Sequence, residues 1–349
     1  MTADTVGGVW TYATELARAL PDVTIVLAAM GGPIPGDVPP NVRPNLRDYK
    51  LEWMDDPWDD VARAGDWLLD LERIESPDVV HLNGYAHGAL PFAAPKIVVG
   101  HSCVLSWWRA VKGEDAPDSW DHYAHAVEHG LRGADLVVAP SAWMLGALHE
   151  HYRFETPSRL IYNGRVGRLP LAVGRRGVFA AGRLWDEAKN LRAVVDAAPS
   201  ISWPVRIAGD GGASAPNVAH LGRLDGDGMS HAFAEAGIYL FPALYEPFGL
   251  SILEAALAGC ALVLGDIPSL REIWRDAAIF VPPRDPAAIA RAVNEVIDDD
   301  DLRLELARRA RERGAAFTPQ AMASGYRAAY ASLSANSQQP TANRSESRA

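Results

Sequence analysis

The sequence has only two cysteines, Cys103 and Cys260, among its 349 residues. Two cysteines in apolar surroundings do not make a disulfide framework, and they favour a reducing, cytoplasmic setting. No Cys/His cluster has the spacing of a zinc site. No apolar run is long enough to span a bilayer, and nothing resembles a signal peptide. We therefore expect neither a disulfide-rich scaffold nor a membrane-spanning protein.

Positive charge is also scarce, because the formal net charge is −11. Residues 1–170 contain 14 Lys and Arg against 23 Asp and Glu, and the remainder contains 19 against 21. An acidic first half argues against a nucleic-acid partner, and peripheral contact with anionic lipid is possible but not favoured. Hydrophobic residues make up 48% of the chain, and its length is enough for two globular domains.

Short apolar strands alternate with helical patterns in both halves of the chain, which is typical of α/β domains with parallel sheets. A stretch rich in Gly, Arg and Pro separates the halves and reads as a linker. We expect a first domain at 1–165, a linker at 166–175, a second domain at 176–317, a returning helix at 318–334 and a disordered tail at 335–349. Residues 30–44 read as a loop, because they are rich in Gly and Pro.

The start of the chain is unusual. A Rossmann-like half places a strand before its first Gly-rich turn, but at most a few residues precede Gly7 and Gly8 here. We expect that most of this first strand is missing, through a late start assignment or a real truncation. By itself, the Gly-Gly pair is an ordinary turn before the helix that follows.

The most informative stretch is residues 239–272. It reads as a buried strand, a loop with Pro and Gly, a helix at about 249–258 and a second strand at 261–264, which together make a βαβ unit. Ligands of such sheets bind at the carboxyl ends of the strands. Glu246 lies on the loop and Glu254 lies within the helix.

The helix start is a ready anion site, because the N–H groups of Gly249 and Leu250 should be free and the helix dipole favours negative charge. A bound phosphate would repel Glu246 and Glu254, whereas sugar hydroxyls would donate hydrogen bonds to them. A nucleotide sugar has both groups. Two plainer interpretations stay open: Ser251 and Glu254 fit a capping box, and Glu246 fits a solvated loop charge.

The sequence E-P-F-G-L-S-I-L-E in this stretch resembles the E-x7-E region of glycosyltransferase family 4, whose members are retaining enzymes with the GT-B fold. The resemblance implies that Glu246 lies beside the donor sugar and that Glu254 holds the ribose. It also places Phe248, Gly249 and Leu250 on the donor, with the amides of the last two facing the diphosphate.

Further residues resemble the same family. The segment G-R-L followed by E-x-K-N resembles its diphosphate clamp, in which Arg183 and Lys189 would stabilise the departing diphosphate. Gly7 and Gly8 resemble the loop that lies against the donor, and His101 resembles the histidine that reaches the donor sugar. The resemblance thus gives catalytic roles to His101, Arg183, Lys189 and Glu246. His81 and His87 have weaker claims.

The fold that the resemblance implies is α/β, with two Rossmann-like domains facing across a cleft and a C-terminal helix crossing back to the first domain. The implied activity is transfer of a sugar, with retained configuration, from a nucleoside-diphosphate sugar to a carbohydrate or other acceptor hydroxyl. No metal and no cofactor are expected. The implied setting is polysaccharide biosynthesis in the cytoplasm. The alternatives are an inactive nucleotide-sugar-binding protein and a nucleotide-sugar epimerase on the same fold.

One segment resembles a metal-binding motif of another fold, and another segment departs from the family pattern. Asp225-Gly226-Asp227 is formally a D-x-D motif, which holds a metal in a different glycosyltransferase fold, but here we expect it to start a helix. Residues 268–270 are Pro-Ser-Leu where the family often has a Gly-rich turn, although Glu272 is kept.

Overall fold

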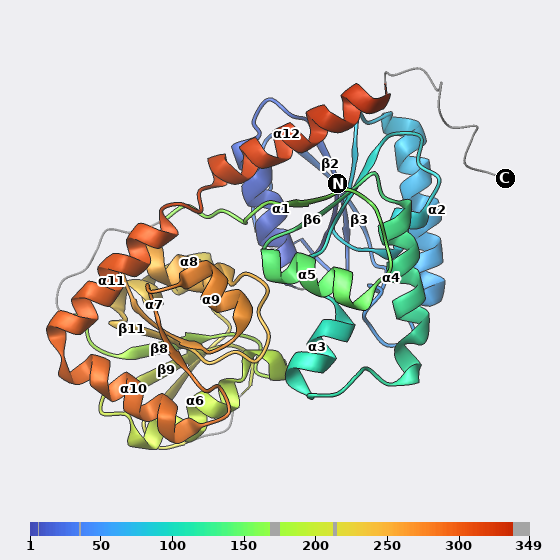
Figure 1. Cartoon of the computed structure of the whole chain (residues 1–349). Coiled ribbons are helices and arrows are strands. Elements are labelled where there is room, and N and C mark those ends of the chain that lie inside the picture. Colours follow the sequence, from blue (N-terminus) through green and yellow to red (C-terminus); the bar gives the residue numbers. More distant parts are fainter. Residues whose placement is uncertain (6, 35, 168–174, 212–214, 338–349) are drawn as a thin grey trace.

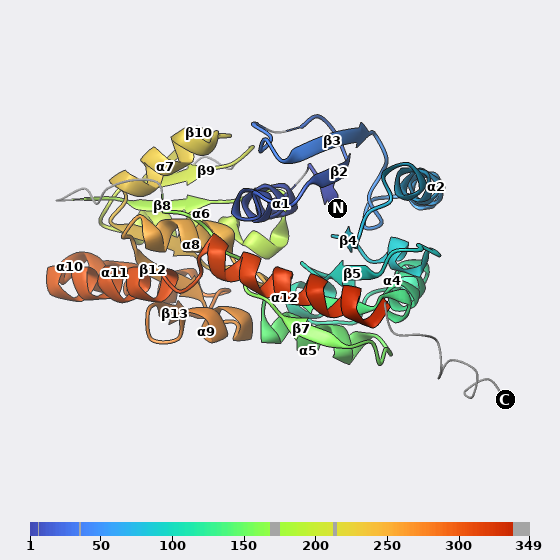
Figure 2. The ribbon, with the colours of Figure 1, turned by 90° about the horizontal axis from the view of Figure 1, so that it is seen from above.

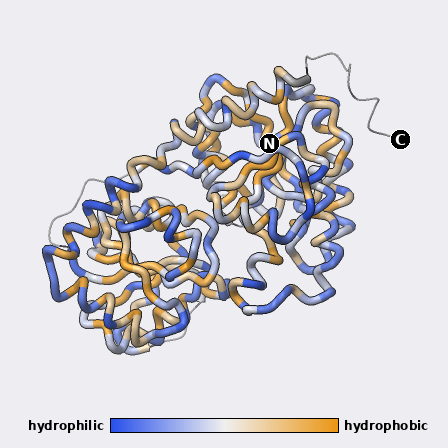
Figure 3. The backbone as a smooth tube through the Cα atoms, viewed as in Figure 1, coloured by the Kyte–Doolittle hydropathy of each residue, from blue (hydrophilic) through white to orange (hydrophobic). Residues whose placement is uncertain are grey.

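The structure is a computed structural model that describes residues 1–5, 7–34, 36–167, 175–211 and 215–337 (Figure 1). It contains two α/β domains, and helix α12 (Pro319–Ser337) leaves the second domain and lies across the first (Figure 2). The fold class expected from the sequence is therefore confirmed. Hydrophobic segments gather in the central strands, while the outer helices alternate between hydrophobic and hydrophilic residues (Figure 3).

In the described part of the first domain, parallel strands form two sheets, in the orders β1-β2-β3 and β4-β5-β6-β7. The strands are β1 (Thr2–Asp4), β2 (Ile25–Met30), β3 (Val42–Arg47), β4 (Val80–Leu82), β5 (Lys96–Val99), β6 (Leu136–Ala139) and β7 (Ser158–Leu160). The helices are α1 (Gly8–Ala19), α2 (Trp58–Glu75), η1 (Ala86–Ala89), α3 (Val104–Val111), η2 (Asp118–Trp120), α4 (Asp121–Gly133) and α5 (Ala142–His151).

The first strand, β1, has three residues. β1 pairs along its whole length with Ala28–Met30 of β2, but it shares no ladder with β4 in the described structure. A side chain makes the connection instead: Asn83, just after β4, donates from its backbone N to Thr2 Oγ1 at 2.8 Å and from Nδ2 to Thr2 O at 2.7 Å. Asn83 therefore links the two sheets through its hydrogen bonds to Thr2 of β1.

In the second domain, the described strands form one parallel sheet in the order β10-β9-β8-β11-β12-β13. They are β8 (Val178–Ala181), β9 (Val205–Ala208), β10 (Val218–Gly222), β11 (Ile238–Phe241), β12 (Ala261–Gly265) and β13 (Ile279–Val281). The order reverses between β8 and β11. Ligands of open α/β sheets bind at such a reversal, beyond the carboxyl ends of the two strands.

Strand β11 shows why this sheet is stable. All four of its residues are buried, because helices cover both faces of a parallel sheet. Ile238 and Leu240 join one core with α6 (Leu191–Ala197) and α10 (Pro286–Asp298), whereas Tyr239 and Phe241 join the opposite core. Burying each of these side chains contributes roughly 1.5–3 kcal/mol. The opposite core also contains residues from α7 (Gly226–Glu235), α8 (Leu250–Leu257), α9 (Pro268–Trp274) and α11 (Asp300–Gly314).

Two local expectations need correction. Residues 42–47 form β3, although they lie partly in the segment predicted as a loop; only Val42 of this strand is buried, so the sequence shows no apolar alternation. Residues 268–274 form helix α9, where the family comparison suggested a turn. Pro268 suits the first helical position, and Leu270, Ile273 and Trp274 are fully buried.

The two chain segments that cross between the domains touch each other. A Cβ atom on Gly164 would lie 2.2 Å from the carbonyl oxygen of Thr318, so only glycine fits there. Arg165 N donates to Phe317 O at 3.0 Å. Of the predicted linker and tail, residues 168–174 and 338–349 lie outside the described residues.

Candidate functional site

The candidate site lies at the reversal point of the second sheet. Arg183 follows β8, and Glu246 lies on the loop between β11 and α8, so both side chains project from the same edge of the sheet. Lys189 closes the short helix η3 (Glu187–Lys189) after the same β8 loop. A Cβ atom on Gly182 would lie 3.3 Å from Lys189 Cβ, which shows how closely this loop folds back on the strand end.

Lys189 and Glu246 form an ion pair, with 2.7 Å between Nζ and Oε2. The two side chains are only 20% and 14% exposed, so Glu246 is not the solvated loop charge that the sequence left open. Ser269 Oγ also donates to the backbone oxygen of Glu246 at 2.7 Å, which fixes the loop against α9. The site therefore holds a carboxylate whose charge is already balanced by a cation.

Helix α8 begins at Leu250 without a side-chain cap. Its N-cap is Gly249, whose φ of 88° is left-handed, and a Cβ atom there would lie 2.6 Å from Ile252 Cδ1. Ser251 lies inside the first turn, and its hydroxyl accepts from Tyr239 at 3.0 Å, so the capping-box interpretation is wrong. The uncapped N–H groups of this turn are suited to an anion.

Phe248 differs from the other predicted donor residues, because its side chain is buried. The ring packs against Phe317 and Tyr162, with centroids 5.6 Å and 6.4 Å away. Its apolar ring thus joins the core below the loop, so the predicted contact of Phe248 with the donor would have to come from its backbone.

Arg183 lies at the border with the first domain. Its guanidinium pairs with Asp186 at 2.9 Å, stacks on Trp185 with 4.8 Å between Cζ and the ring centroid, and remains 38% exposed. A Cβ atom on Gly7 would lie 3.5 Å from Arg183 Nη1, and one on Gly8 would lie 3.7 Å from Leu250 Cδ1. The structure therefore brings the Gly-Gly turn of the first domain against the predicted clamp of the second.

Glu254 lies one turn further along α8 and has a partner that the sequence did not suggest. Its Oε1 accepts from Arg165 Nε, and Arg165 Nη1 lies 2.9 Å from Oε1 of Glu15 on α1. The side chains of Glu254, Arg165 and Glu15 are 21%, 12% and 5% exposed. An arginine directly after an Asn-Gly pair carries no sequence signal of its own, and only the fold shows that it joins two carboxylates.

In the first domain, His101 follows β5 and its ring contacts the side chain of Asn83, with 2.9 Å between Nε2 and Oδ1. Because Asn83 Nδ2 donates to Thr2, the Oδ1 atom is the acceptor, which assigns the proton of His101 to Nε2. Burial lowers the pKa of His101 to about 4. The imidazole is therefore neutral near pH 7, and its unprotonated Nδ1 can accept a hydrogen bond.

The other two histidines considered from the sequence have packing roles. His81 lies among the rings of α1 and α12, with 2.7 Å between its Nδ1 and Tyr330 Oη, and burial lowers its pKa. His87 Nε2 contacts the carbonyl oxygen of Val61 at 3.0 Å, and burial lowers its pKa too. His81 thus ties β4 to the crossing helix, and His87 ties η1 to α2.

The domains also touch at further points, at the starts of α3 and α5. Tyr245 Oη accepts from the backbone N of Cys103 at 3.0 Å and lies 2.9 Å from Ser106 Oγ. Glu272 accepts from the backbone N of Ala142 and of Trp143, both at 2.8 Å, at the start of α5. The acidic group therefore meets the positive end of a helix dipole across the domain border. Neither contact was expected from the sequence.

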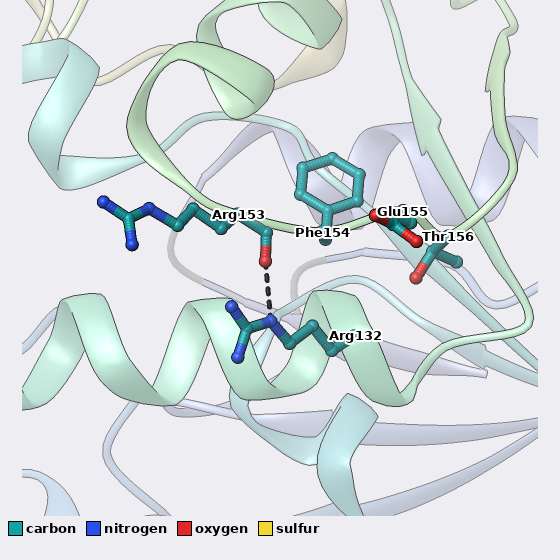
Figure 4. Close-up of a pocket in the computed structure, with 5 residues that line it drawn as sticks. All are labelled: Arg132, Arg153, Phe154, Glu155 and Thr156. Atoms are coloured by element: carbon teal, nitrogen blue, oxygen red, sulfur yellow. Dashed lines mark hydrogen bonds between the residues drawn. The ribbon is translucent and has the colours of Figure 1, made fainter. Parts of the chain in front are cut away.

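Two pockets stand out. A cavity of about 200 Å³ lies beside α8 and is lined by Thr11, Arg165, Leu224, Asp225, Met229 and Glu254, among others. A larger, open pocket of about 530 Å³ lies between Arg132 and residues 153–156, where Arg132 Nε donates to Arg153 O at 2.7 Å (Figure 4). It directly precedes β7, so it lies at the amino ends of the strands, away from His101. Of the predicted site residues, Glu254 lines the smaller cavity and none lines the larger pocket.

The D-x-D segment starts a helix, as expected. Asp225 is the N-cap of α7, and its Oδ1 accepts from Gly228 N at 2.8 Å. Within the described ranges, no group of three or more His, Cys, Asp or Glu side chains could hold a metal ion. None of the described helices combines the length and the apolar content needed to cross a bilayer.

Two facing Rossmann-like domains, with cations and a helix start at the sheet reversal, define the class of GT-B glycosyltransferases. Residues 6–165 match the family described as Glycosyltransferase Family 4, and residues 175–299 match Glycosyl transferases group 1. A glycogen synthase of Mycobacterium tuberculosis is 31% identical over 291 residues, which cover 72% of this chain and 68% of that protein. The chain therefore belongs to the glycosyltransferases of family 4 and group 1 that these two matches describe.

Other similarities extend over the fold or over a shorter segment. Sucrose-phosphate synthase of Thermosynechococcus elongatus has a TM-score of 0.81 at 18% identity and covers 96% of each chain. Anabaena HepE in complex with UDP and glucose has a TM-score of 0.74 at 16% identity and covers 95% of this chain and 99% of that one. An Escherichia coli O-antigen chain mannosyltransferase B is 33% identical over 86 residues, which are 25% of this chain and 23% of that protein.

Proposed function

We propose that this protein transfers a sugar from a nucleoside-diphosphate sugar to an acceptor hydroxyl, with the anomeric configuration retained. The observation that carries the proposal is the meeting of three features at one sheet reversal: the cations Arg183 and Lys189, the uncapped start of α8, and the Gly-Gly turn of the first domain. Each of them suits a diphosphate.

The diphosphate accounts for the charges of the site. A departing nucleoside diphosphate accumulates negative charge, and preorganised donors that face this charge lower the barrier. Arg183 supplies a planar fork and Lys189 a point charge, while the N–H groups of Gly249 and Leu250 supply neutral donors. We propose that these groups do the work that a metal ion would otherwise do. Activity is then expected to survive EDTA, and a loss that Mn²⁺ restores would contradict this part of the proposal.

Glu246, Glu254 and His101 provide hydrogen-bond acceptors for the hydroxyls of the donor. Glu246 is held and neutralised by Lys189, so it can accept hydrogen bonds from donor hydroxyls without repelling the phosphates. His101 lies on the opposite domain, and Nδ1 of its neutral ring can accept a hydrogen bond from a further hydroxyl of the sugar. Glu254 lines the 200 Å³ cavity, which suits the nucleoside, and there it would hold the ribose. The acceptor would approach from the first domain.

The setting is proposed on the same grounds. Glycogen synthase and an O-antigen mannosyltransferase among the relatives favour a carbohydrate acceptor and a role in polysaccharide biosynthesis. The acidic first half of the chain does not favour a nucleic acid or an anionic lipid surface. We propose a cytoplasmic enzyme, since nucleotide sugars are its expected donors and its cysteines are free.

A donor screen tests the proposal. UDP-, ADP- and GDP-sugars are incubated with the protein, alone and with oligosaccharide acceptors, and released nucleoside diphosphate is measured. Slow release without acceptor and faster release with one are expected, and proton NMR of the product would show the retained configuration. Tight binding without any release would indicate the inactive binding protein. Conversion of the donor sugar without release would indicate an epimerase.

A further inference from the structure

We propose that Arg165 is a positioning residue that sets the carboxylate of Glu254 for the ribose of the donor and ties it to the first domain. This inference rests on the proposed function, and its experiment separates the two. Nothing in the sequence pattern of the site includes Arg165, which follows Asn163 and Gly164 at the domain junction.

Backbone contacts fix the position of Arg165 independently of its side chain. Its N–H donates to Phe317 O at 3.0 Å, and the neighbouring Gly164 lies against Thr318. The residue is therefore held where both crossing segments meet. From this point the side chain reaches Glu254 on α8 through Nε and Glu15 on α1 through Nη1, the latter at 2.9 Å. One guanidinium thus joins an acid from each domain.

The charges alternate along this chain of contacts. Arg18 pairs with Glu15 at 2.9 Å, Glu15 pairs with Arg165, and Arg165 pairs with Glu254. Withdrawing a carboxylate from water without a partner is costly, and the guanidinium offsets this cost for Glu254. A guanidinium is planar and donates in fixed directions, so it orients the carboxylate as well as balancing its charge.

The contacts leave part of Glu254 for a ligand. Arg165 engages Oε1, and in the described part of the chain no side chain or backbone group donates a hydrogen bond to Oε2. Both residues line the 200 Å³ cavity together with Thr11, Leu224, Asp225 and Met229. A carboxylate oxygen that faces a cavity accepts hydrogen bonds, and the two neighbouring hydroxyls of a ribose are matching donors. Arg165 therefore presents Oε2 to the ribose while it holds Oε1.

The test compares nucleotides with and without these hydroxyls. Dissociation constants of UDP and 2′,3′-dideoxy-UDP are measured by calorimetry; if UDP does not bind, the ADP and GDP pairs are used. We expect the wild type to prefer the ribose form by about 10-fold or more. Arg165→Gln should reduce this preference to about 3-fold or less by weakening the ribose form alone. Arg165→Lys should restore part of the preference, because it keeps the charge but reaches only one carboxylate.

Arg327→Gln is the matched control. Arg327 also links α12 to the first domain, through a pair with Asp22, but it does not line the cavity. Its loss should leave the ribose preference unchanged. If Arg165→Gln does not fold, Glu15→Gln replaces it, since this change removes the anchor of Arg165 on the first domain and should lower the preference by about 3-fold.

The outcomes separate the two claims. An unchanged ribose preference in Arg165→Gln, or in Glu15→Gln where that variant is used, would overturn the inference and leave the proposed function intact. Tighter UDP binding by Arg165→Gln would overturn it too, because Arg165 would then compete with the ribose. Failure of the wild type to bind any of the three nucleoside diphosphates would instead contradict the proposed function.

Discussion

The two halves of the site differ in how they handle charge. The second domain contributes ion pairs, namely Lys189 with Glu246 and Arg183 with Asp186. The first domain contributes a glycine turn and the neutral His101, whose pKa is lowered to about 4. One half is thus suited to a diphosphate, whereas the other offers a hydrogen-bond acceptor to an uncharged group.

The difference follows from burial. Arg183 is partly exposed and has a local acidic partner, so water and Asp186 both stabilise its charge. His101 lies against Tyr12, 4.6 Å between ring centroids, and its nearest hydrogen-bond partner is an amide oxygen that cannot balance a positive charge. Loss of water without a compensating carboxylate favours the neutral imidazole. A glycosyl transfer needs both environments, one for the leaving group and one for the sugar.

The largest effect is expected from the charged half. Arg183→Ala should lower kcat by about 10²-fold or more, because it removes one preorganised donor that faces the developing charge. Stability should change little, since the side chain is exposed and pairs only with a neighbour in sequence. Steady-state kinetics with the donor found in the screen measures this effect.

Arg192→Ala is the control for this change. Arg192 forms a comparable exposed pair with Asp196 at 2.8 Å on the same domain, on helix α6. Its loss should leave kcat unchanged. Equal rates for the wild type and Arg183→Ala would show that the charged half does not act on the leaving group.

A smaller effect is expected from the neutral half. His101→Gln should lower kcat by about 10-fold, because it removes one hydrogen bond to the sugar, and it should leave the affinity for the nucleoside diphosphate nearly unchanged. His87→Gln is the matched control, since His87 is also half-buried with a lowered pKa, and its hydrogen-bond partner among the described residues is the carbonyl oxygen of Val61. It should change stability and leave kcat unaltered. Weaker nucleotide binding by His101→Gln would show that the two halves are not separate.

The smallest expected effect is on the stability of the protein at acidic pH. The pKa of His101 is about 4 in the folded protein and about 6.5 in an unfolded chain, so the unfolded state binds more protons between these values. The free energy of unfolding should therefore fall as the pH falls from 6.5 towards 4, by up to about 1.4 kcal/mol per pH unit for this group. Above pH 6.5 this contribution is constant.

Urea unfolding at pH 6.5, 5.5 and 4.5 measures that slope. His101→Gln should show a shallower slope than the wild type by the share of this one group, while Arg183→Ala should keep the wild-type slope. Identical slopes for the wild type and His101→Gln would show that His101 gains its proton in the folded protein as readily as in the unfolded chain.

Predictions from the sequence worked best where the pattern is local. The βαβ unit at 239–264 could be recognised because its apolar runs and Gly-Pro loop are contiguous, and Glu246 and Glu254 are placed by that unit alone. Strand β3 was missed because only Val42 in it is buried, and α9 was not predicted because the family often has a Gly-rich turn where Pro268 starts a helix here. Phe248 was assigned to the donor because the motif names it, whereas its ring lies in the core.

The sequence by itself determined the two α/β halves and the order of the groups at the sheet reversal, since periodicity and short motifs are written within single elements. The tertiary structure alone decided that Asn83 holds His101, that Glu272 meets α5 and that Arg165 joins Glu15 to Glu254. The two partners are 18 residues apart for Asn83 and His101, and 130 apart for Glu272 and Ala142. Arg165 is 89 residues from Glu254 and 150 from Glu15. Such contacts depend on how distant elements pack within and between the domains, and no local pattern of residues records that packing.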